Sequence, residues 1–313
     1  MIGTDISERH LNFLQVLKSY YQLTKPRIIP LLLITTAASI WMASLGRVDP
    51  FLLVITLLGG TLAAASAQAF NCIYDQDIDY LMVRTRSRPI PSGRIQPRHA
   101  LIFATVLAIL SFSVLAYFVN LLSALLALLG IVFYLVVYTH YTHWLKRNST
   151  QNIVIGGAAG SIPPLVGWAA VTGHLAAPAW VLFMLVFLWT PPHFWALALM
   201  IKDDYKEVNI PMMPVIEGEV ETTRQIWIYT LIVVPFSLLL VYPLGTLGLV
   251  YTVFAVVLGW VFLSKAWQVQ QNPFDQDLAR SLFKYSILYM MLLCTGMVID
   301  TLPLTHRILA LVY

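Results

Sequence analysis

Apolar residues occur in nine long runs along the chain, and polar residues gather between them. The runs cover residues 28–45, 51–73, 97–118, 121–140, 151–172, 178–201, 225–243, 246–265 and 283–302. Each is close to the roughly 20 residues that an α-helix needs to cross a bilayer. The alternating pattern of membrane-spanning strands is not evident, and backbone polar groups in lipid must pair within their own segment. The pattern predicts an all-α integral membrane protein with nine transmembrane helices.

Composition and charge support the membrane class and predict which side of the membrane each terminus faces. Of the 313 residues, 59% are hydrophobic and 11% are charged, whereas soluble domains carry about 25% charged residues. Among the 19 Lys and Arg residues, Arg47 and Arg307 alone fall in the loops of one side. Because cytoplasmic loops carry the excess of Lys and Arg, we expect a cytoplasmic N-terminus and a C-terminus outside. The net charge of +4 is thereby explained, and no nucleic-acid partner is expected.

Domain organisation follows from the same pattern. Residues 1–27 are expected to form a cytoplasmic N-terminal segment, in which residues 11–23 have the amphipathic pattern of an interfacial helix. Residues 28–313 are expected to form a single membrane domain. The N-terminus has no signal-peptide pattern, and its short length favours a bacterial inner membrane over a mitochondrion.

A first polar cluster follows the second run. Asn71, Asp75 and Asp79 are spaced i, i+4, i+8 and should project from one face of a helix that leaves the membrane. Three stacked acceptors repel one another unless a cation neutralises them, and Mg²⁺ takes one or two protein carboxylates together with water and phosphate oxygens. The arginines that follow, including Arg84 and Arg88, suit a bound polyanion. The alternative is an ordinary solvated helix end.

A second polar cluster, "KDDYKE" at residues 202–207, lies four helices later. Two acidic clusters with basic neighbours are what a diphosphate held by Mg²⁺ requires. We therefore expect two half-sites that face each other across a central cavity open to the cytoplasmic side. An ordinary charged loop is the alternative. A secondary transporter would place its binding groups near mid-bilayer, whereas these clusters lie at helix ends.

Longer motifs carry a family resemblance that extends from about residue 20 to residue 300. They are "LTKPRI" at 23–28, "NCIYDQDID" at 71–79, "LKRNSTQNIVIGGAAGSIPPLVGW" at 145–168 and "WTPPHFWALALMIKDDYKEVNIPMMPV" at 189–215. Together they resemble the UbiA superfamily of intramembrane prenyltransferases and, within it, the protoheme IX farnesyltransferase (haem O synthase) family.

The resemblance implies an enzyme, a transferase that moves farnesyl from farnesyl diphosphate to the 2-vinyl group of haem b. Water adds in the reaction, and the products are haem O and diphosphate. Mg²⁺ is the implied cofactor, with the bilayer, haem b and farnesyl diphosphate as partners. Haem A synthase or a terminal oxidase is expected only as a pathway neighbour.

The resemblance also implies roles for individual residues. Metal ligands would be Asn71, Asp75, Asp79, Asp203 and Asp204. Diphosphate would be bound by Arg84, Arg88, Lys146, Arg147 and Lys202. Asp204 and Tyr205 match the family's second motif and join Asn71, Asp75, Asp79 and His193 as candidate catalytic residues. Haem would contact His193, Trp195 and Asn152.

His193 has a physical argument of its own, because a histidine inside a hydrophobic helix is costly and usually functional. It could bind haem iron, or orient the propionates or the attacking water. The glycines at 156, 157 and 160 form either a close helix-packing surface or a flat wall for a planar macrocycle. A family member that prenylates 4-hydroxybenzoate or a naphthoate remains the main alternative; His193 and the D-D-Y-K-E form of the second motif argue against it.

Overall fold

The computed structural model describes residues 12–136 and 149–302, and within these residues the regular secondary structure is entirely helical. The elements are α1 (Phe13–Leu23), α2 (Ile29–Ala43), α3 (Pro50–Tyr74), α4 (Gln76–Leu81), α5 (Pro97–Phe118), α6 (Leu121–Phe133), α8 (Asn152–Gly160), α9 (Pro163–Thr172), α10 (Ala177–Met200), α11 (Lys202–Glu207), α12 (Met213–Ile216), α13 (Gly218–Ser237), η2 (Leu238–Leu240), α14 (Leu249–Gln271) and α15 (Gln276–Thr301).

The predicted apolar runs coincide with helices in the described part of the chain. Seven segments are long and apolar enough to cross a membrane: Pro50–Tyr74, Pro97–Phe118, Asn152–Thr172, Ala177–Met200, Gly218–Leu240, Leu249–Gln271 and Gln276–Thr301. Two shorter apolar helices, Ile29–Ala43 and Leu121–Val136, complete the predicted nine. The all-α membrane class is therefore confirmed. One run is broken, because residues 151–172 form α8 and α9 on either side of Ser161 and Ile162, just before Pro163 and Pro164.

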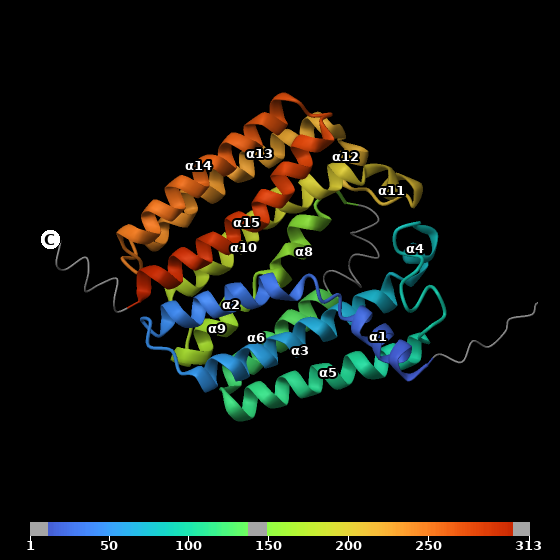
Figure 1. Cartoon of the computed structure of the whole chain (residues 1–313), viewed down its shortest axis with the longest axis horizontal. Helices are drawn as coiled ribbons and strands as arrows, with labels where there is room; N and C mark the ends of the chain where they lie inside the picture. Colours follow the sequence, from blue (N-terminus) through green and yellow to red (C-terminus); the bar gives the residue numbers. More distant parts are fainter. Residues whose placement is uncertain (1–11, 137–148, 303–313) are drawn as a thin grey trace, which may run out of the picture.

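The helices form a bundle with α10 near its middle. Helix α10 packs against α8, α9, α13 and α15, while α3 runs along α5 and α2 packs on α9 and α15. The short helices α4, α11 and α12 gather at one end of the bundle, and the C-terminal end of α15 lies at the opposite end (Figure 1). We call the end that carries α4 and α11 the polar end. It brings together the two polar clusters that the sequence separates.

Helix starts follow local sequence signals. The side chains of Asp49, Asn120 and Asp275 accept hydrogen bonds from backbone N–H groups in the first turns of α3, α6 and α15, as N-cap residues do. Helix α1 coincides with the predicted amphipathic segment and leaves Phe13, Leu14 and other apolar side chains exposed. Its place at a membrane interface stays a prediction.

Small residues allow the helices to approach closely, as is usual in membranes. A Cβ added at Gly167 of α9 would lie 2.4 Å from the backbone oxygen of Thr36 in α2. At Gly157 of α8 it would lie 2.8 Å from the side chain of Thr190 in α10, whereas a Cβ added at Gly160 would meet no neighbouring element of the described chain within 4 Å. The packing role predicted for the glycine segment is confirmed at Gly157. The macrocycle wall stays a prediction.

Candidate active site

The first polar cluster keeps its predicted spacing across the junction of α3 and α4. The backbone N–H of Asp75 donates to the carbonyl of Asn71 at 2.9 Å, and that of Asp79 donates to the carbonyl of Asp75 at 2.8 Å. Helical register thus continues through the junction. The side-chain amide of Asn71 also donates to Asp75 Oδ2 at 2.9 Å. Asn71 and Asp75 therefore form one oxygen-rich pair at the polar end.

Asp79 takes part in a separate, buried ion pair. Arg88 Nη1 lies 2.8 Å from Asp79 Oδ1 and 2.7 Å from Oδ2. The Asp79 side chain is only 5% exposed, and that of Arg88 is 28% exposed. Arg88 consequently anchors the loop after α4 to α4 itself. The metal role of Asp79 and the phosphate role of Arg88 stay predictions, and each would require this pair to rearrange or to be shared.

Lys25 is a site residue that the sequence analysis did not single out. It lies between α1 and α2 with φ of 45°, a conformation that non-glycine residues seldom adopt and that is often found at functional sites. Its ammonium group donates to Asn71 Oδ1. Desolvation lowers the pKa of Lys25 below its usual value. The motif "LTKPRI" contained this residue, but contact with a side chain 46 positions away has no sequence signal.

The two polar clusters meet through Arg84 and Asp204. Arg84 Nε lies 3.4 Å from Asp204 Oδ2, although 120 positions separate them. Beneath this contact, Ile78, Met82 and Ile210 form a small buried cluster on which Tyr205 packs. Apolar packing therefore links α4 to Tyr205 of α11 and to the segment after α11, while the facing half-sites stay a prediction.

Lys202 and Asp203 lie apart from this contact. Lys202 Nζ donates to Glu219 Oε1 of α13 at 2.5 Å, and both residues line a pocket with Asp203 and Asp275 at the start of α15. The structure does not bring the Asp203 carboxylate to Asn71 and Asp75 by any contact it records. The diphosphate role of Lys202 and the metal role of Asp203 stay predictions. Lys146 and Arg147 lie outside the described residues.

The oxygen donors at the polar end suit a divalent cation that shares its ligands with a diphosphate. Within residues 12–136 and 149–302, no three His, Cys, Asp or Glu side chains are grouped to hold a metal by themselves. Asn71, Asp75 and Asp204 nevertheless offer hard oxygen donors, and Mg²⁺ usually binds through one or two carboxylates plus substrate phosphates. The donor set fits a metal that arrives with its substrate.

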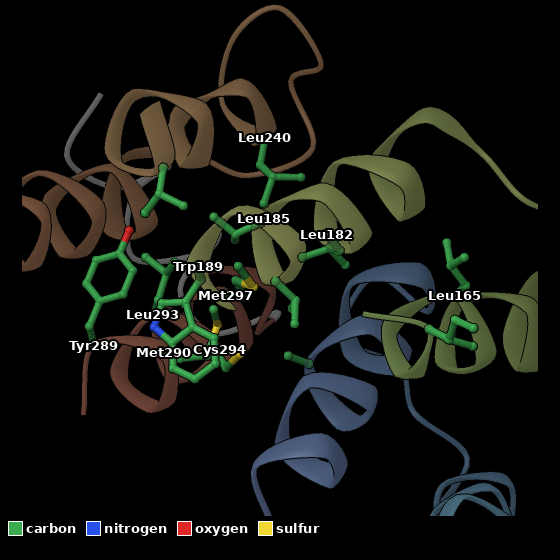
Figure 2. Close-up of a cluster of buried hydrophobic side chains, with 14 of the residues drawn as sticks. Leu165, Leu182, Leu185, Trp189, Leu240, Tyr289, Met290, Leu293, Cys294 and Met297 are labelled. Carbon is green, nitrogen blue, oxygen red and sulfur yellow. The ribbon is translucent and has the colours of Figure 1, made fainter. Parts of the chain in front are cut away.

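His193 is buried on α10. Its Nδ1 lies 2.7 Å from Ser286 Oγ of α15, and the indole N–H of the neighbouring Trp189 donates to the backbone oxygen of Ser286 at 2.9 Å. Trp189 itself lies among Met290, Leu293 and Cys294 between the two helices (Figure 2). Ser286 had no sequence signal, because only the tertiary fold brings it to α10.

The other two predicted haem contacts point elsewhere. Trp195, 1% exposed, packs edge-on against Tyr229 of α13 with ring centroids 5.3 Å apart, so it does not share a face with His193. Asn152 donates to Met212 Sδ at 3.6 Å. Its buried Oδ1 has no hydrogen-bond partner within the described chain. Asn152 thus keeps a free acceptor, and both haem contacts stay predictions.

A comparison with known protein families decides the assignment. Residues 32–288 match the model of the UbiA prenyltransferase family. The chain belongs to the UbiA prenyltransferase family. It is therefore a multi-pass membrane protein and a prenyltransferase, and the predicted superfamily is confirmed.

Relatives and solved structures of the UbiA family agree with this. The chain is 72% identical over 312 residues to the protoheme IX farnesyltransferase of Gloeothece citriformis, covering 100% of this chain and 96% of that protein. It is 70% identical over 308 residues to the protoheme IX farnesyltransferase of Synechocystis sp., covering 98% and 96%.

Two solved structures share the fold at low identity. A digeranylgeranylglyceryl phosphate synthase has a TM-score of 0.73 at 20% identity, covering 91% of this chain and 98% of that one. A UbiA homolog from Archaeoglobus fulgidus, bound to GPP and Mg²⁺, has a TM-score of 0.61 at 15% identity, with coverages of 89% and 99%. These likenesses confirm the fold.

Proposed function

We propose that the chain transfers the farnesyl group of farnesyl diphosphate to the 2-vinyl group of haem b, with addition of water, giving haem O and diphosphate. The observation that carries the proposal is the contact between the two polar clusters, in which Arg84, after α4, reaches Asp204 of α11. The choice of acceptor is supported by the protoheme IX farnesyltransferases that match the whole chain at 72% identity.

The polar end supplies the groups that hold the diphosphate. Asn71, Asp75 and Asp204 would hold Mg²⁺, which supplies positive charge to offset the charge that develops on the leaving diphosphate. Arg84 is 48% exposed and can turn its guanidinium from Asp204 to phosphate oxygens, which it binds in the same bidentate manner. Lys25 donates to Asn71 Oδ1, the oxygen that would hold Mg²⁺, so metal binding would require Lys25 to release this oxygen or to share it.

The reaction balances without a redox partner. The bond between farnesyl C1 and the diphosphate oxygen breaks, and its electron pair leaves with diphosphate. The vinyl π electrons of haem b form the new carbon–carbon bond, which leaves a cation on the other vinyl carbon. Water adds there and loses a proton. The buried aromatic surroundings of His193 are suited to keep bulk water from the allylic cation.

The same proposal includes a location and an orientation. We place the protein in a bacterial inner membrane with the polar end in the cytoplasm. The support is that helix α11 and the segment between α4 and α5, which lie at the polar end (Figure 1), carry several Lys and Arg residues, namely Arg84, Arg88, Arg94 and Lys202, as the positive-inside rule requires. Farnesyl diphosphate, a charged molecule, would then enter from the aqueous side.

The test of the acceptor is a parallel assay with purified protein in detergent. Farnesyl diphosphate and Mg²⁺ are supplied with either haem b or 4-hydroxybenzoate, and products are identified by mass spectrometry. The proposal expects haem O and no prenylated benzoate. A prenylated benzoate without haem O would keep the diphosphate chemistry and overturn the acceptor.

A further inference from the structure

His193 lies on the side of α10 that faces the inside of the bundle. Trp189, four residues earlier, contacts α15 through the carbonyl of Ser286, and Thr190, three residues earlier, lies against Gly157 of α8. Side chains three and four positions apart share one helix face. His193 therefore projects between α15 and α8.

Two aromatic rings hold the imidazole in place. Trp189 stacks on it with centroids 4.4 Å apart and planes inclined by 16°, and Phe283 stacks on it at 4.7 Å and 21°. Such contacts cover the faces of the imidazole ring. They leave its edge, which carries the two nitrogens, as the part that can act chemically.

Ser286 determines which nitrogen carries the proton. Its hydroxyl donates to the backbone oxygen of Phe283 at 2.7 Å. The hydroxyl has one proton, so its oxygen must accept at the second contact, from His193 Nδ1–H at 2.7 Å. In the opposite tautomer Nδ1 would have no proton, and its lone pair would face the Ser286 oxygen, whose own proton is already given to Phe283. Nε2 therefore carries an unshared electron pair.

This arrangement is the one that metal-binding histidines use. A ligating histidine almost always donates its other ring N–H to an oxygen, which fixes the tautomer and the ring orientation. Here the chain runs from His193 Nδ1 to Ser286 Oγ and on to the Phe283 carbonyl.

We propose that His193 Nε2 binds the iron of the haem b substrate axially, and that Ser286 is the positioning residue that holds His193 in the required tautomer. The inference rests on the proposed haem substrate. It assigns to α10 and α15 the task of holding the macrocycle while its vinyl group reaches the farnesyl diphosphate at the polar end.

Porphyrin binding with and without iron tests the ligand. Haem b is titrated into the purified protein and followed by absorption and electron paramagnetic resonance spectra, and iron-free protoporphyrin IX is titrated in parallel. In His193→Ala we expect haem affinity to fall by at least about 10-fold and the signature of a histidine-bound iron to disappear, while protoporphyrin affinity stays within about 2-fold. Added imidazole should restore the spectrum.

The positioning role is tested with a pair of serine variants. Ser286→Ala should weaken haem binding by about 10-fold and alter the iron spectrum, whereas Ser286→Thr keeps the hydroxyl and should restore both. Ser111→Ala is the matched control, because Ser111 is also a buried serine that donates to a backbone oxygen, that of Gly59, between α5 and α3. It should leave the haem spectrum unchanged.

The outcomes separate this inference from the proposed function. Haem O formation with an iron spectrum identical in the parent and in His193→Ala would overturn the axial ligand and leave the activity standing. Equal losses of haem and protoporphyrin affinity would also overturn it, since the histidine would then shape the pocket rather than bind iron. Absence of both haem binding and haem O formation in the parent would overturn the proposed function, and with it the inference.

Discussion

Replacing Arg88 with alanine should destabilise the protein more than any exposed ion-pair substitution. Arg88→Ala leaves the Asp79 carboxylate, 5% exposed, without either of its two short hydrogen bonds. Breaking a buried pair by removing one partner costs about 3–5 kcal/mol. The Arg88 side chain is 28% exposed, so water can reach part of the site, and we expect a loss of about 2–3 kcal/mol.

The opposite substitution should cost less, because the charge it leaves behind can be hydrated. Asp79→Asn leaves the partly exposed guanidinium of Arg88 and should cost about 1 kcal/mol. The double variant, with no buried charge left unpaired, should be more stable than Arg88→Ala alone. Coupling between the two changes is what a double-mutant cycle measures.

The assay is reversible unfolding in mixed detergent and SDS micelles, followed by circular dichroism. Arg280→Ala is the matched control. The ion pair between Arg280 and Asp277 has a similar N–O distance, 2.8 Å, but the Arg280 side chain is 51% exposed and the Asp277 side chain is 87% exposed. Its cost should be about 0.5 kcal/mol or less. If Arg88→Ala destabilises no more than Arg280→Ala, the reasoning about the buried carboxylate is refuted.

Further substitutions test other contacts. Asp300→Ala should lower the free energy of unfolding by about 1–3 kcal/mol, because its buried carboxylate accepts two backbone N–H groups at the start of α14; an unchanged unfolding curve would contradict this. Gly167→Ala should cost about 1–3 kcal/mol in the same assay, since its Cβ would meet a backbone oxygen of α2, whereas Gly160→Ala has free space and should cost far less. Lys25→Met should lower the rate of haem O formation by about 10-fold through loss of its hold on the Asn71 amide, and a parental rate would remove Lys25 from the site. EDTA should abolish haem O formation measured by mass spectrometry, and Mg²⁺ should restore it; activity that persists in EDTA would exclude a divalent metal.

Much of the fold could be predicted from the sequence because lipid imposes strict local rules. Helix length and apolar character are fixed by the bilayer, so the nine runs coincide with helices as far as residues 12–136 and 149–302 describe them. The helical register predicted for Asn71, Asp75 and Asp79 is also present, because i→i+4 backbone hydrogen bonds continue from α3 into α4.

The pairing of site residues could not be predicted, because it depends on which helices become neighbours. Lys25 reaches Asn71, Lys202 reaches Glu219, and Ser286 reaches His193 across 93 positions. The spacing of residues in the sequence predicts which side chains share a face of one helix, but it does not predict which side chains of two different helices touch. A resemblance to a family supplies motifs, yet it did not indicate that Asp79 is held by Arg88 or that Asp203 lies beside Glu219.

We propose above that the two polar clusters form one diphosphate site for farnesyl transfer to haem b. The most direct measurement is the initial rate of haem O formation, by mass spectrometry of extracted haems, for the parent, Asp75→Ala, Asp204→Ala and the exposed control Asp77→Ala. We expect the rate to fall by at least about 100-fold in Asp75→Ala and Asp204→Ala and to stay near the parental value in Asp77→Ala. Near-parental rates for Asp75→Ala or Asp204→Ala, or an equal loss in all three variants, would contradict it.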